Sequence, residues 1–508
     1  MKKWINKSGK LALGLIVGVG LTVSFAFTTN YFDVSKQLDI FNTLFKELNM
    51  YYVDETDPGK LMNKAIDAML ESLDPYTTYI PEEDIEDYRF QQTGQYGGVG
   101  AIIRRDGDYV IIAEPYHGFP ADKAGLIAGD KIKEIDGKSV KGKNTSDISS
   151  VLKGEPGTEV ELKIERAISG KEIVTKIKRE EIQVKSVPYA GVLEGEIGYI
   201  RLRSFTETAS KDVKDALKKL KAESQLKGLV LDLRGNPGGL LREAVNICNI
   251  FIPKGQEVVS TKGKIKEWDR IYKTSNAPID IEIPLTILIS RSSASASEIV
   301  AGTLQDLDRA VIVGERSFGK GLVQQPRKLT YGSQLKVTIA KYYTPSGRCI
   351  QAIDYSNRND DGSVGKMADS LRTKFSTTNG RAVYDGGGVD PDTDTEALKY
   401  GQIVGSLIRK NLVFDFATKY KYEHPSIASP ETFKVDEKLY EEFVSFLSDK
   451  DYEYETETEK SLNKWKKNAE DENYFDGVAS IYEQLKTELE AHKEDDIHKY
   501  QDQIDDLI

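Results

Sequence analysis

Residues 285–306 read LTILISRSSASASEIVAGTLQD, and the segment changes character near its middle. The run from 285 to 290 is almost entirely apolar, as in a buried strand, whereas residues 297–307 carry apolar side chains at helical spacing. The small residues between the two allow a tight turn into the start of a helix, where backbone N–H groups lack partners within the helix. We therefore predict a strand, a turn and a helix, with Ser295 at the junction.

Strands and helices alternate on both sides of this segment. Short apolar runs predict the strands, and helical spacing of apolar residues predicts the segments between them. The predicted strands cover 198–202, 228–233, 285–290 and 310–313, and the predicted helices cover 210–222, 240–251 and 297–307. Regular alternation of this kind favours an α/β layer with parallel strands.

A chain of 508 residues is too long for one core, and its pattern changes at several points. Helical spacing predominates before residue 90 and again after 394. Between 94 and 182, short strands separated by Gly and Pro turns predict a compact β-rich module with one short helix. The predicted organisation is a multidomain α/β protein with helical N- and C-terminal regions, divided into residues 1–30, 31–92, 93–183, 184–400 and 401–508.

The N-terminus has the pattern of an export signal. Lys2, Lys3, Lys7 and Lys10 precede an uncharged run from 11 to 30 that is rich in Leu, Val, Gly and Phe. A basic segment followed by an apolar one is typical of a signal peptide or membrane anchor, and the run is long enough to span a bilayer. The sequence leaves cleavage open, and we expect the body of the protein to work outside the cytoplasm.

Composition excludes several functions. The formal net charge of −11 argues against a nucleic-acid ligand, because such proteins usually present a basic face. Two cysteines, Cys248 and Cys349, cannot make a disulfide framework. No Cys or His pair has the spacing of zinc ligands, so the sequence points to no metal and to no other cofactor.

Ser295 admits two interpretations. A serine at the start of a helix faces free N–H groups that could stabilise an oxyanion. Ser295 and Glu298 also fit a capping box, in which a serine N-cap pairs with a glutamate three residues later. Taken alone, the segment favours the cap.

A second segment, GERSFGKGLVQ (314–324), places Lys320 between two glycines. Residues 314–320, GERSFGK, also match the first seven positions of a phosphate-binding loop, G-x-x-x-x-G-K. The eighth position, which should be Ser or Thr, is Gly321, and the residues that follow are strand-like where a helix is required. A nucleotide-binding protein is therefore a weaker alternative.

Histidine is absent from the whole predicted α/β region, since none lies between 118 and 423. A Ser-His-Asp triad within that region is excluded, and an activated Ser295 needs another base. Serine proteases that use a lysine base are known. Such a lysine must be neutral at working pH, a state that burial favours.

At this point the sequence resembles a known family. The segments SASASEIVAGTLQD (293–306) and GERSFGKGLVQ, whose Ser295 and Lys320 are 25 residues apart, are similar to those of the carboxyl-terminal processing peptidases, or tail-specific proteases. Other segments match the same family in order: LDPYTTYI (73–80), DLRGNPGG (232–239), YYTPSGR (342–348) and GGVDPD (387–392). The resemblance implies a serine endopeptidase with a crotonase-like α/β core.

The resemblance also assigns roles to residues. It implies that Ser295 is the nucleophile, that Lys320 is the general base and that Gln324 orients the lysine. The oxyanion hole would comprise the N–H of Ala296 and that of a glycine in the pair Gly238 and Gly239. That glycine pair also fits a plain strand-to-helix turn.

Residues 94–182 resemble a PDZ domain. The peptide-binding residues would be Gly97, Gly98, Val99 and Gly100, because consecutive N–H groups can hold a terminal carboxylate while the next strand pairs with the peptide. A β-turn is the alternative for this Gly-rich loop. Arg166 is a candidate for coupling the binding of a C-terminal tail to the catalytic residues.

The resemblance therefore implies an enzyme that selects cell-envelope proteins by their C-terminal tails and processes or degrades them, and a homodimer is a further expectation. From another functional class, a catalytically silent adaptor that only binds such tails stays open.

Overall fold

The computed structural model describes residues 31–355, 358, 364–396, 399–424, 426–429 and 432–508. The predicted signal peptide or anchor, residues 1–30, lies outside them. Contacts within the chain divide it into two units. Among the described residues, the N-terminal unit holds 31–82 and 324–338, and the main unit holds the others.

The N-terminal unit begins with two helices. Residues 31–51 form the first, and α2 (Pro58–Glu71) is the second. Helix α2 begins after Asp57, whose side chain accepts a hydrogen bond from the Lys60 N–H, and a proline at the first helical position suits this start.

The unit also contains a piece of sheet that the sequence did not predict. Strand β1 (Thr78–Ile80) pairs antiparallel with the first part of β18 (Gln334–Tyr343), and β17 (Leu322–Lys328) pairs with β18 as well. A strand of three residues is stable only through its partner, and here the partner lies more than 250 positions away in the sequence.

The main unit contains the α/β layer. Its six strands lie in the order β10-β11-β12-β15-β16-β21, and the pairs from β11 to β21 are parallel, while β10 is an antiparallel edge. The strands are β10 (Tyr189–Leu193), β11 (Ile197–Arg201), β12 (Gly228–Asp232), β15 (Leu285–Ile289), β16 (Val311–Gly314) and β21 (Thr393–Asp394). The four predicted strands are therefore confirmed to within about a residue at each end.

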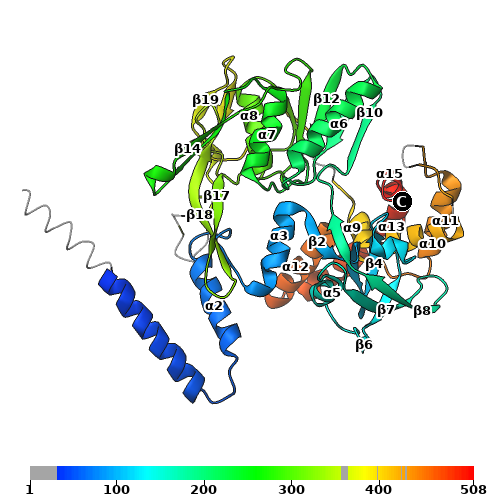
Figure 1. Cartoon of the computed structure of the whole chain (residues 1–508). Helices are drawn as coiled ribbons and strands as arrows, with labels where there is room; N and C mark the ends of the chain where they lie inside the picture. Colours follow the sequence, from blue (N-terminus) through cyan, green and yellow to red (C-terminus); the bar gives the residue numbers. More distant parts are fainter. Residues whose placement is uncertain (1–30, 356–357, 359–363, 397–398, 425, 430–431) are drawn as a thin grey trace, which may run out of the picture. The chain divides into compact units, whose positions relative to one another are not determined.

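Three helices accompany this sheet: α6 (Ala209–Glu223), α7 (Leu241–Phe251) and α8 (Ala296–Asp306). Helices α7 and α8 pack side by side (Figure 1). Every residue of α8 is buried, because the helix contacts both β16 and a strand of a second sheet, β13 (Glu257–Gly263). Strand β13 pairs with the second part of β18 and with β14 (Arg270–Lys273).

The buried end of α8 is fixed by an ion pair. The guanidinium of Arg348, with no exposed surface, lies 2.8 Å from the Asp306 carboxylate and donates to Gln305 Oε1. Gln305 Nε2 donates in turn to the Asp390 carbonyl oxygen. Two of the family-like segments, YYTPSGR and GGVDPD, thus supply the groups that satisfy the polar residues at this end of α8.

The β-rich module has its own core and a five-strand path, β3-β4-β5-β7-β8, with β6 beside β5. Its strands are β3 (Ala101–Asp106), β4 (Tyr109–Pro115), β5 (Lys131–Ile135), β6 (Lys138–Ser139), β7 (Glu159–Glu165) and β8 (Glu172–Lys178). A separate pair, β2 (Gln95–Gly98) with β9 (Glu180–Gln183), follows α3 (Ile85–Thr93). The module contains two helices, α4 (Pro120–Lys123) and α5 (Thr145–Leu152), where the sequence predicted one.

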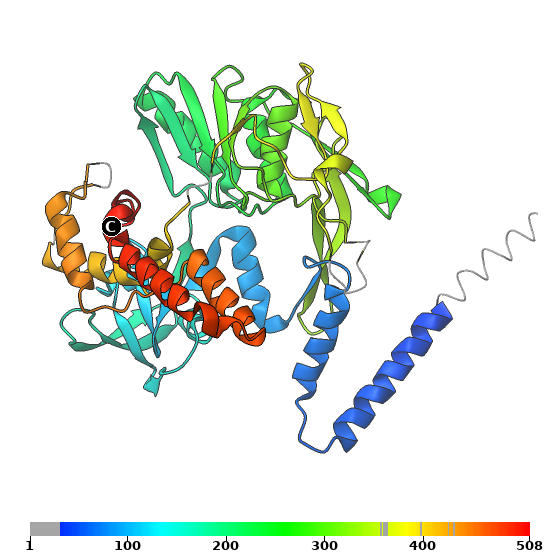
Figure 2. The same cartoon turned by 180° about the vertical axis from the view of Figure 1, so that it is seen from behind.

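The C-terminal region is helical, as predicted, and has a third core that includes Leu407, Phe416, Tyr440 and Phe443. Figure 2 shows its helices in orange and red, with α12 packed on α13. They are α9 (Gln402–Arg409), α10 (Leu412–Glu423), α11 (Glu437–Leu447), α12 (Glu457–Asp471), α13 (Phe475–Glu494), α14 (Asp496–Lys499) and α15 (Gln501–Asp505). Among the described residues, no helix is both long and apolar enough to cross a membrane.

The ion pair at the end of α8 leads to a stability prediction. Replacing Arg348 by alanine leaves the Asp306 carboxylate buried without its cation, so we expect the free energy of unfolding to fall by about 3–5 kcal/mol. Arg242→Ala is the control, because this side chain is largely exposed, and we expect a change within about 0.5 kcal/mol. Urea denaturation measures both, and equal unfolding midpoints for the two variants would contradict the prediction.

Candidate active site

Ser295 lies at the N-cap of α8 in an unusual backbone conformation, with φ 56° and ψ −111°. Positive φ is uncommon for residues other than glycine and costs on the order of 1–3 kcal/mol in sparsely populated regions. An ordinary N-cap in this chain, Thr456 of α12, has φ −75° and ψ 158°, although it too is followed by a glutamate at the third helical position. A cap alone therefore does not explain the Ser295 geometry, which resembles the strained strand-to-helix turn of serine hydrolases.

The Glu298 carboxylate joins the backbone of Ser295 to the loop that carries Lys320. Its Oε2 accepts hydrogen bonds from the N–H groups of Ser295, at 2.8 Å, and Lys320, at 2.9 Å. Its Oε1 accepts from the Ser317 hydroxyl, at 2.5 Å, and from the Gly319 N–H, at 2.7 Å. One side chain thus holds both segments that the sequence singled out.

Glu298 is completely buried, and burial raises the pKa of its carboxyl group, while the four hydrogen bonds act in the opposite direction. All four partners donate, so they match an ionised carboxylate, which only accepts. The Ser317 hydroxyl is itself placed by the Val389 N–H, which donates to it at 2.7 Å. The capping-box interpretation is confirmed for Glu298, but the cap is only one of its bonds.

Tyr342 makes a second connection between the same two residues. Its hydroxyl donates toward the carbonyl oxygens of Ser295, at 3.1 Å, and Lys320, at 2.8 Å. Burial raises the pKa of Tyr342 well above its ordinary value, so the hydroxyl keeps its proton and remains a donor. The backbones of Ser295 and Lys320 are therefore linked through their N–H groups by a carboxylate and through their carbonyls by a phenol.

The DLRGNPGG segment reaches Ser295 from the end of β12. Gly238 has φ 101°, and a Cβ on it would lie 2.9 Å from both Ser295 Cβ and Ala296 N, so only glycine fits here. Asn236 holds this turn, because its carbonyl oxygen accepts from the Ala294 N–H and from the Ser297 hydroxyl. The turn therefore lies directly against the nucleophile candidate.

The two glycines are not equivalent as oxyanion-hole candidates. The Gly238 N–H already donates to Asn236 Oδ1 at 2.9 Å. Gly239 follows it, and its neighbour Leu240 donates to the Phe205 carbonyl oxygen. Of the predicted pair, Gly238 is thus the one whose N–H is already bound within the turn.

Gln324 belongs to the N-terminal unit and lies in β17, four residues after Lys320 in the sequence. Its Nε2 donates to the Thr338 hydroxyl at 3.2 Å. The strand β17 also decides the nucleotide-binding alternative, because a phosphate-binding loop leads into a helix. The GERSFGKG segment leads into a strand, so that alternative is wrong.

The predicted peptide-binding loop is only partly a loop. Gly97 and Gly98 lie in β2 and pair with Glu181 and Glu180 of β9, so only Val99 and Gly100 form the turn into β3. Among the described strands, β3 pairs with β4 alone, which leaves its other edge without a strand. Helix α5 contacts β3, so an open strand edge and a helix lie next to each other.

Arg166 follows the last residue of β7 and binds inside the β-rich module. Its guanidinium lies 3.1 Å from the buried Asp130 carboxylate and donates to the Gly125 carbonyl oxygen. Burial raises the pKa of Asp130 to about 6, against the effect of Arg166. The structure thus assigns Arg166 an ion pair within the module, and its predicted coupling role stays a prediction.

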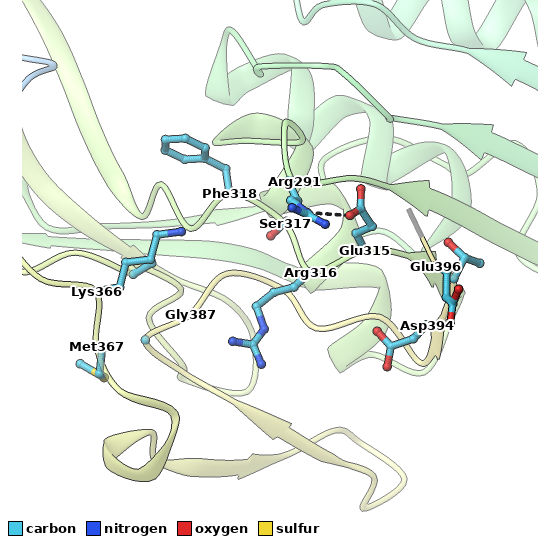
Figure 3. A pocket seen from close by; sticks show the side chains of 13 residues that line it. Arg291, Glu315, Arg316, Ser317, Phe318, Lys366, Met367, Gly387, Asp394 and Glu396 are labelled. Atoms are coloured by element: carbon cyan, nitrogen blue, oxygen red, sulfur yellow. Dashed lines mark hydrogen bonds and ion pairs between the residues drawn. The ribbon is translucent and has the colours of Figure 1, made fainter. Parts of the chain in front are cut away.

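A surface pocket of about 480 Å³ lies beside the loops that carry Ser295 and Lys320 (Figure 3). Arg291 and Phe318 line it from those two loops, and Arg291 forms a 2.6 Å ion pair with Glu315. Lys366 and Glu396 add charges of both signs to the lining.

Sequence reasoning missed several residues that hold this site. Glu298 was interpreted only as part of a cap, and Tyr342 and Asn236 lay in matched segments without a role. A polar residue within a matched, glycine-containing segment was the available signal, because an amide or carboxylate that becomes buried there needs several hydrogen-bond partners. The identity of those partners depends on contacts between distant segments.

Comparison with known proteins gives three family matches. Residues 196–356 match the model of peptidase family S41, residues 111–166 match a PDZ domain, and residues 403–508 match a probable PDZ-protease C-terminal helical domain. The β-rich module, the α/β layer and the C-terminal helices each contain one of the matches.

Two curated relatives are similar over most of their length. A carboxy-terminal-processing protease of Bartonella bacilliformis is 41% identical over 329 residues, which cover 64% of this chain and 75% of that protein. A probable CtpA-like serine protease of Staphylococcus aureus is 37% identical over 359 residues, 69% of this chain and 71% of that protein. Among solved structures, a photosystem II D1 C-terminal processing protease is 29% identical, with a TM-score of 0.36 and coverage of 70% and 92%.

The Glu298 bonds predict the effect of an isosteric change. In Glu298→Gln an NH2 group replaces one carboxylate oxygen, so two of the four donors face another donor and the Ser295 and Lys320 loops lose a shared anchor. We expect peptidase activity to fall by about two orders of magnitude, the scale for a small displacement of catalytic groups. Glu223→Gln is the control, since its exposed carboxylate pairs with Lys219 on the surface of α6. Initial rates on casein measure both, and a Glu298→Gln enzyme as active as the control would contradict the role assigned to Glu298.

Proposed function

This chain belongs to peptidase family S41 and is a serine-type peptidase, and on that premise we propose that Ser295 is its nucleophile and Lys320 its general base. The observation that carries the proposal is the shared carboxylate oxygen, Glu298 Oε2, to which the N–H groups of both residues donate. A nucleophile and its base must be held within reach of each other, and two backbone N–H groups bound to one carboxylate oxygen support such an arrangement.

In the proposed mechanism neutral Lys320 accepts the proton of the Ser295 hydroxyl as its oxygen attacks the carbonyl carbon of the scissile bond. The negative charge that develops on the carbonyl oxygen is stabilised by the N–H groups of Ala296 and Gly239. Lys320 then gives its proton to the leaving amine, which frees the new N-terminus and leaves an acyl-enzyme on Ser295. Water, deprotonated by Lys320, hydrolyses that ester and regenerates the serine.

Gln324 acts in this proposal as the residue that orients Lys320. Its side-chain carbonyl can accept a hydrogen bond from the lysine amine, which leaves the nitrogen lone pair available to the serine proton. This assignment rests on the family resemblance and on the position of Gln324 four residues after Lys320.

The PDZ domain is proposed to select substrates by their C-terminal tails. The open edge of β3 can accept an extended peptide as an added strand, next to α5. The turn at Val99 and Gly100 directly precedes β3 and can present N–H groups to the terminal carboxylate. Gly97 and Gly98, at the end of β2, lead into this turn. Coupling of this event to the catalytic residues through Arg166 belongs to the same proposal.

We also propose that the enzyme acts on proteins of the cell envelope, outside the cytoplasm. The support is the basic and apolar pattern of residues 1–30, which is typical of an export signal or anchor. If residues 1–30 are not cleaved, we propose that they bind the protein to the membrane. We further propose that the protein forms a homodimer.

Removing either proposed catalytic side chain should abolish cleavage. We expect Ser295→Ala and Lys320→Ala to reduce the rate of casein hydrolysis by about three orders of magnitude or more, because nucleophile and base act as one unit. Matched controls are Ser292→Ala, in the same loop, and Lys328→Ala, at the exposed end of β17; both should stay active. Circular dichroism checks folding, and substantial cleavage by either dyad variant would overturn the assignment.

A serine-directed phosphonate separates the enzyme from a silent adaptor. We expect the phosphonate to label Ser295 in the unmodified chain and to leave the Ser295→Ala variant unlabelled, as mass spectrometry of tryptic peptides would show. An adaptor would bind tails without any labelling.

The tail-selection proposal predicts a dependence on the terminal carboxylate. A peptide substrate whose C-terminus is amidated loses the charge that the β2–β3 turn would bind, so we expect its KM to rise by about tenfold, equal to 1.4 kcal/mol of binding. The acid and the amide of one fluorogenic peptide make the comparison. Equal KM values would falsify selection by the carboxylate and leave the dyad untouched.

A further inference from the structure

A hydrogen-bonded cluster in the N-terminal unit joins the LDPYTTYI segment to β18. The buried Asp74 carboxylate accepts from the N–H groups of Tyr76 and Thr77, each at 2.8 Å, and from the Thr77 hydroxyl at 2.9 Å. Thr338 completes the cluster, because its N–H donates to the Thr77 hydroxyl oxygen at 3.1 Å. The turn at Asp74 and the strand that carries Thr338 are therefore fixed to each other.

The Thr338 hydroxyl links this cluster to Gln324. It lies 3.3 Å from Asp74 Oδ1 and 3.2 Å from Gln324 Nε2. An ionised carboxylate only accepts hydrogen bonds, so the single hydroxyl proton of Thr338 goes to Asp74. The hydroxyl oxygen must then accept from Gln324, and only the NH2 end of the amide can donate to it.

The hydrogen bonds from Gln324 to Thr338 and from Thr338 to Asp74 therefore fix the orientation of the Gln324 amide, which could otherwise be flipped. With Nε2 held by Thr338, Oε1 is the end of Gln324 that faces away from the cluster. Lys336 is partly buried near Asp74. Burial lowers the pKa of this lysine, and the negative charge of the Asp74 carboxylate acts in the opposite direction. The Asp74 carboxylate thus has a lysine as a neighbour.

We propose that Asp74 and Thr338 are positioning residues for the peptidase reaction, which act by fixing the orientation of the Gln324 side-chain amide. The proposal rests on the function proposed above, in which Gln324 orients the general base. Neither residue belongs to the proposed dyad of Ser295 and Lys320. Their effect is to exclude the flipped amide, whose NH2 group would donate to the lysine lone pair and occupy the site that must accept the serine proton.

The proposal also explains why a segment of the N-terminal unit carries part of the family pattern. Asp74, Pro75 and Thr77 belong to LDPYTTYI, which lies about 220 positions before Ser295 in the sequence. Asp74 is buried although it could lie in a solvated turn, and a buried carboxylate needs the donors that Thr77 and Thr338 provide. The Asp74 cluster ends at the Gln324 side chain.

A double-mutant cycle on the full-length chain tests the relay. Thr338→Val removes the hydroxyl at nearly constant shape, Thr338→Ser keeps it, and Gln324→Leu removes the amide. We expect Thr338→Val to lower kcat on fluorescein-labelled casein by about tenfold, with KM changed by less than about twofold, because the bound substrate is still oriented but the base is not. Thr338→Ser should retain most of the activity, and Thr330→Val, in the exposed turn between β17 and β18, is the matched control.

The background without Gln324 separates positioning from a structural role. If Thr338 acts through Gln324, Thr338→Val should have almost no further effect on kcat in Gln324→Leu, whereas independent effects would multiply. A tenfold loss in both backgrounds, or no rescue by serine, would overturn the relay. Thermal unfolding of each variant reports any general loss of stability.

Ser295→Ala and Gln324→Leu together distinguish failure of the relay from failure of the proposed function. An active Ser295→Ala enzyme would sink the dyad itself. An inactive Ser295→Ala enzyme together with a fully active Gln324→Leu enzyme would leave the dyad intact and overturn both the role of Gln324 and the relay that serves it.

Discussion

A buried carboxylate with four donors is the constraint around which the site is built. Glu298 has no contact with water, so its charge is tolerated only because every acceptor position has a partner. Those partners come from the start of α8 and from the loop after β16, and neither segment can move without leaving a donor or the carboxylate unsatisfied. The carboxylate also offsets the cost of the strained backbone at Ser295, since it binds the N–H of that residue.

The other end of α8 follows the same logic. A helix buried on all sides cannot be oriented by an apolar stripe, so polar groups at its two ends must specify its position. At the C-terminal end Asp306 pairs with Arg348, which is buried as completely as Glu298. Buried pairs contribute little net stability compared with apolar packing, but removing one partner is costly, and such pairs favour a single arrangement. In this fold the arrangement that they favour is the one that sets Ser295 against Gly238.

Local patterns predicted much of this molecule, and long-range contacts account for the remainder. The strands and helices of the α/β layer followed from periodicity, because each is long enough to show its own spacing. Ser295 and Lys320 were found as members of matched segments. Strand β1 was not predicted, and neither was the bond between Asp74 and Thr338, which joins residues 264 positions apart and has no local signature. Glu298 was seen only as a cap because its partners across the loop are not neighbours in the sequence.

Two segments of this chain share one short pattern and have different structures. Thr456 and Glu459 form an ordinary capping box, in which the hydroxyl accepts from the glutamate N–H and the glutamate accepts from the threonine N–H. Ser295 and Glu298 have the same spacing, yet Glu298 also binds three groups from the loop that carries Lys320, and the serine adopts positive φ. The pattern fixes the start of a helix in both places. What makes one of them a candidate nucleophile is the set of donors brought to the carboxylate from elsewhere in the fold, and that set is a property of the tertiary structure.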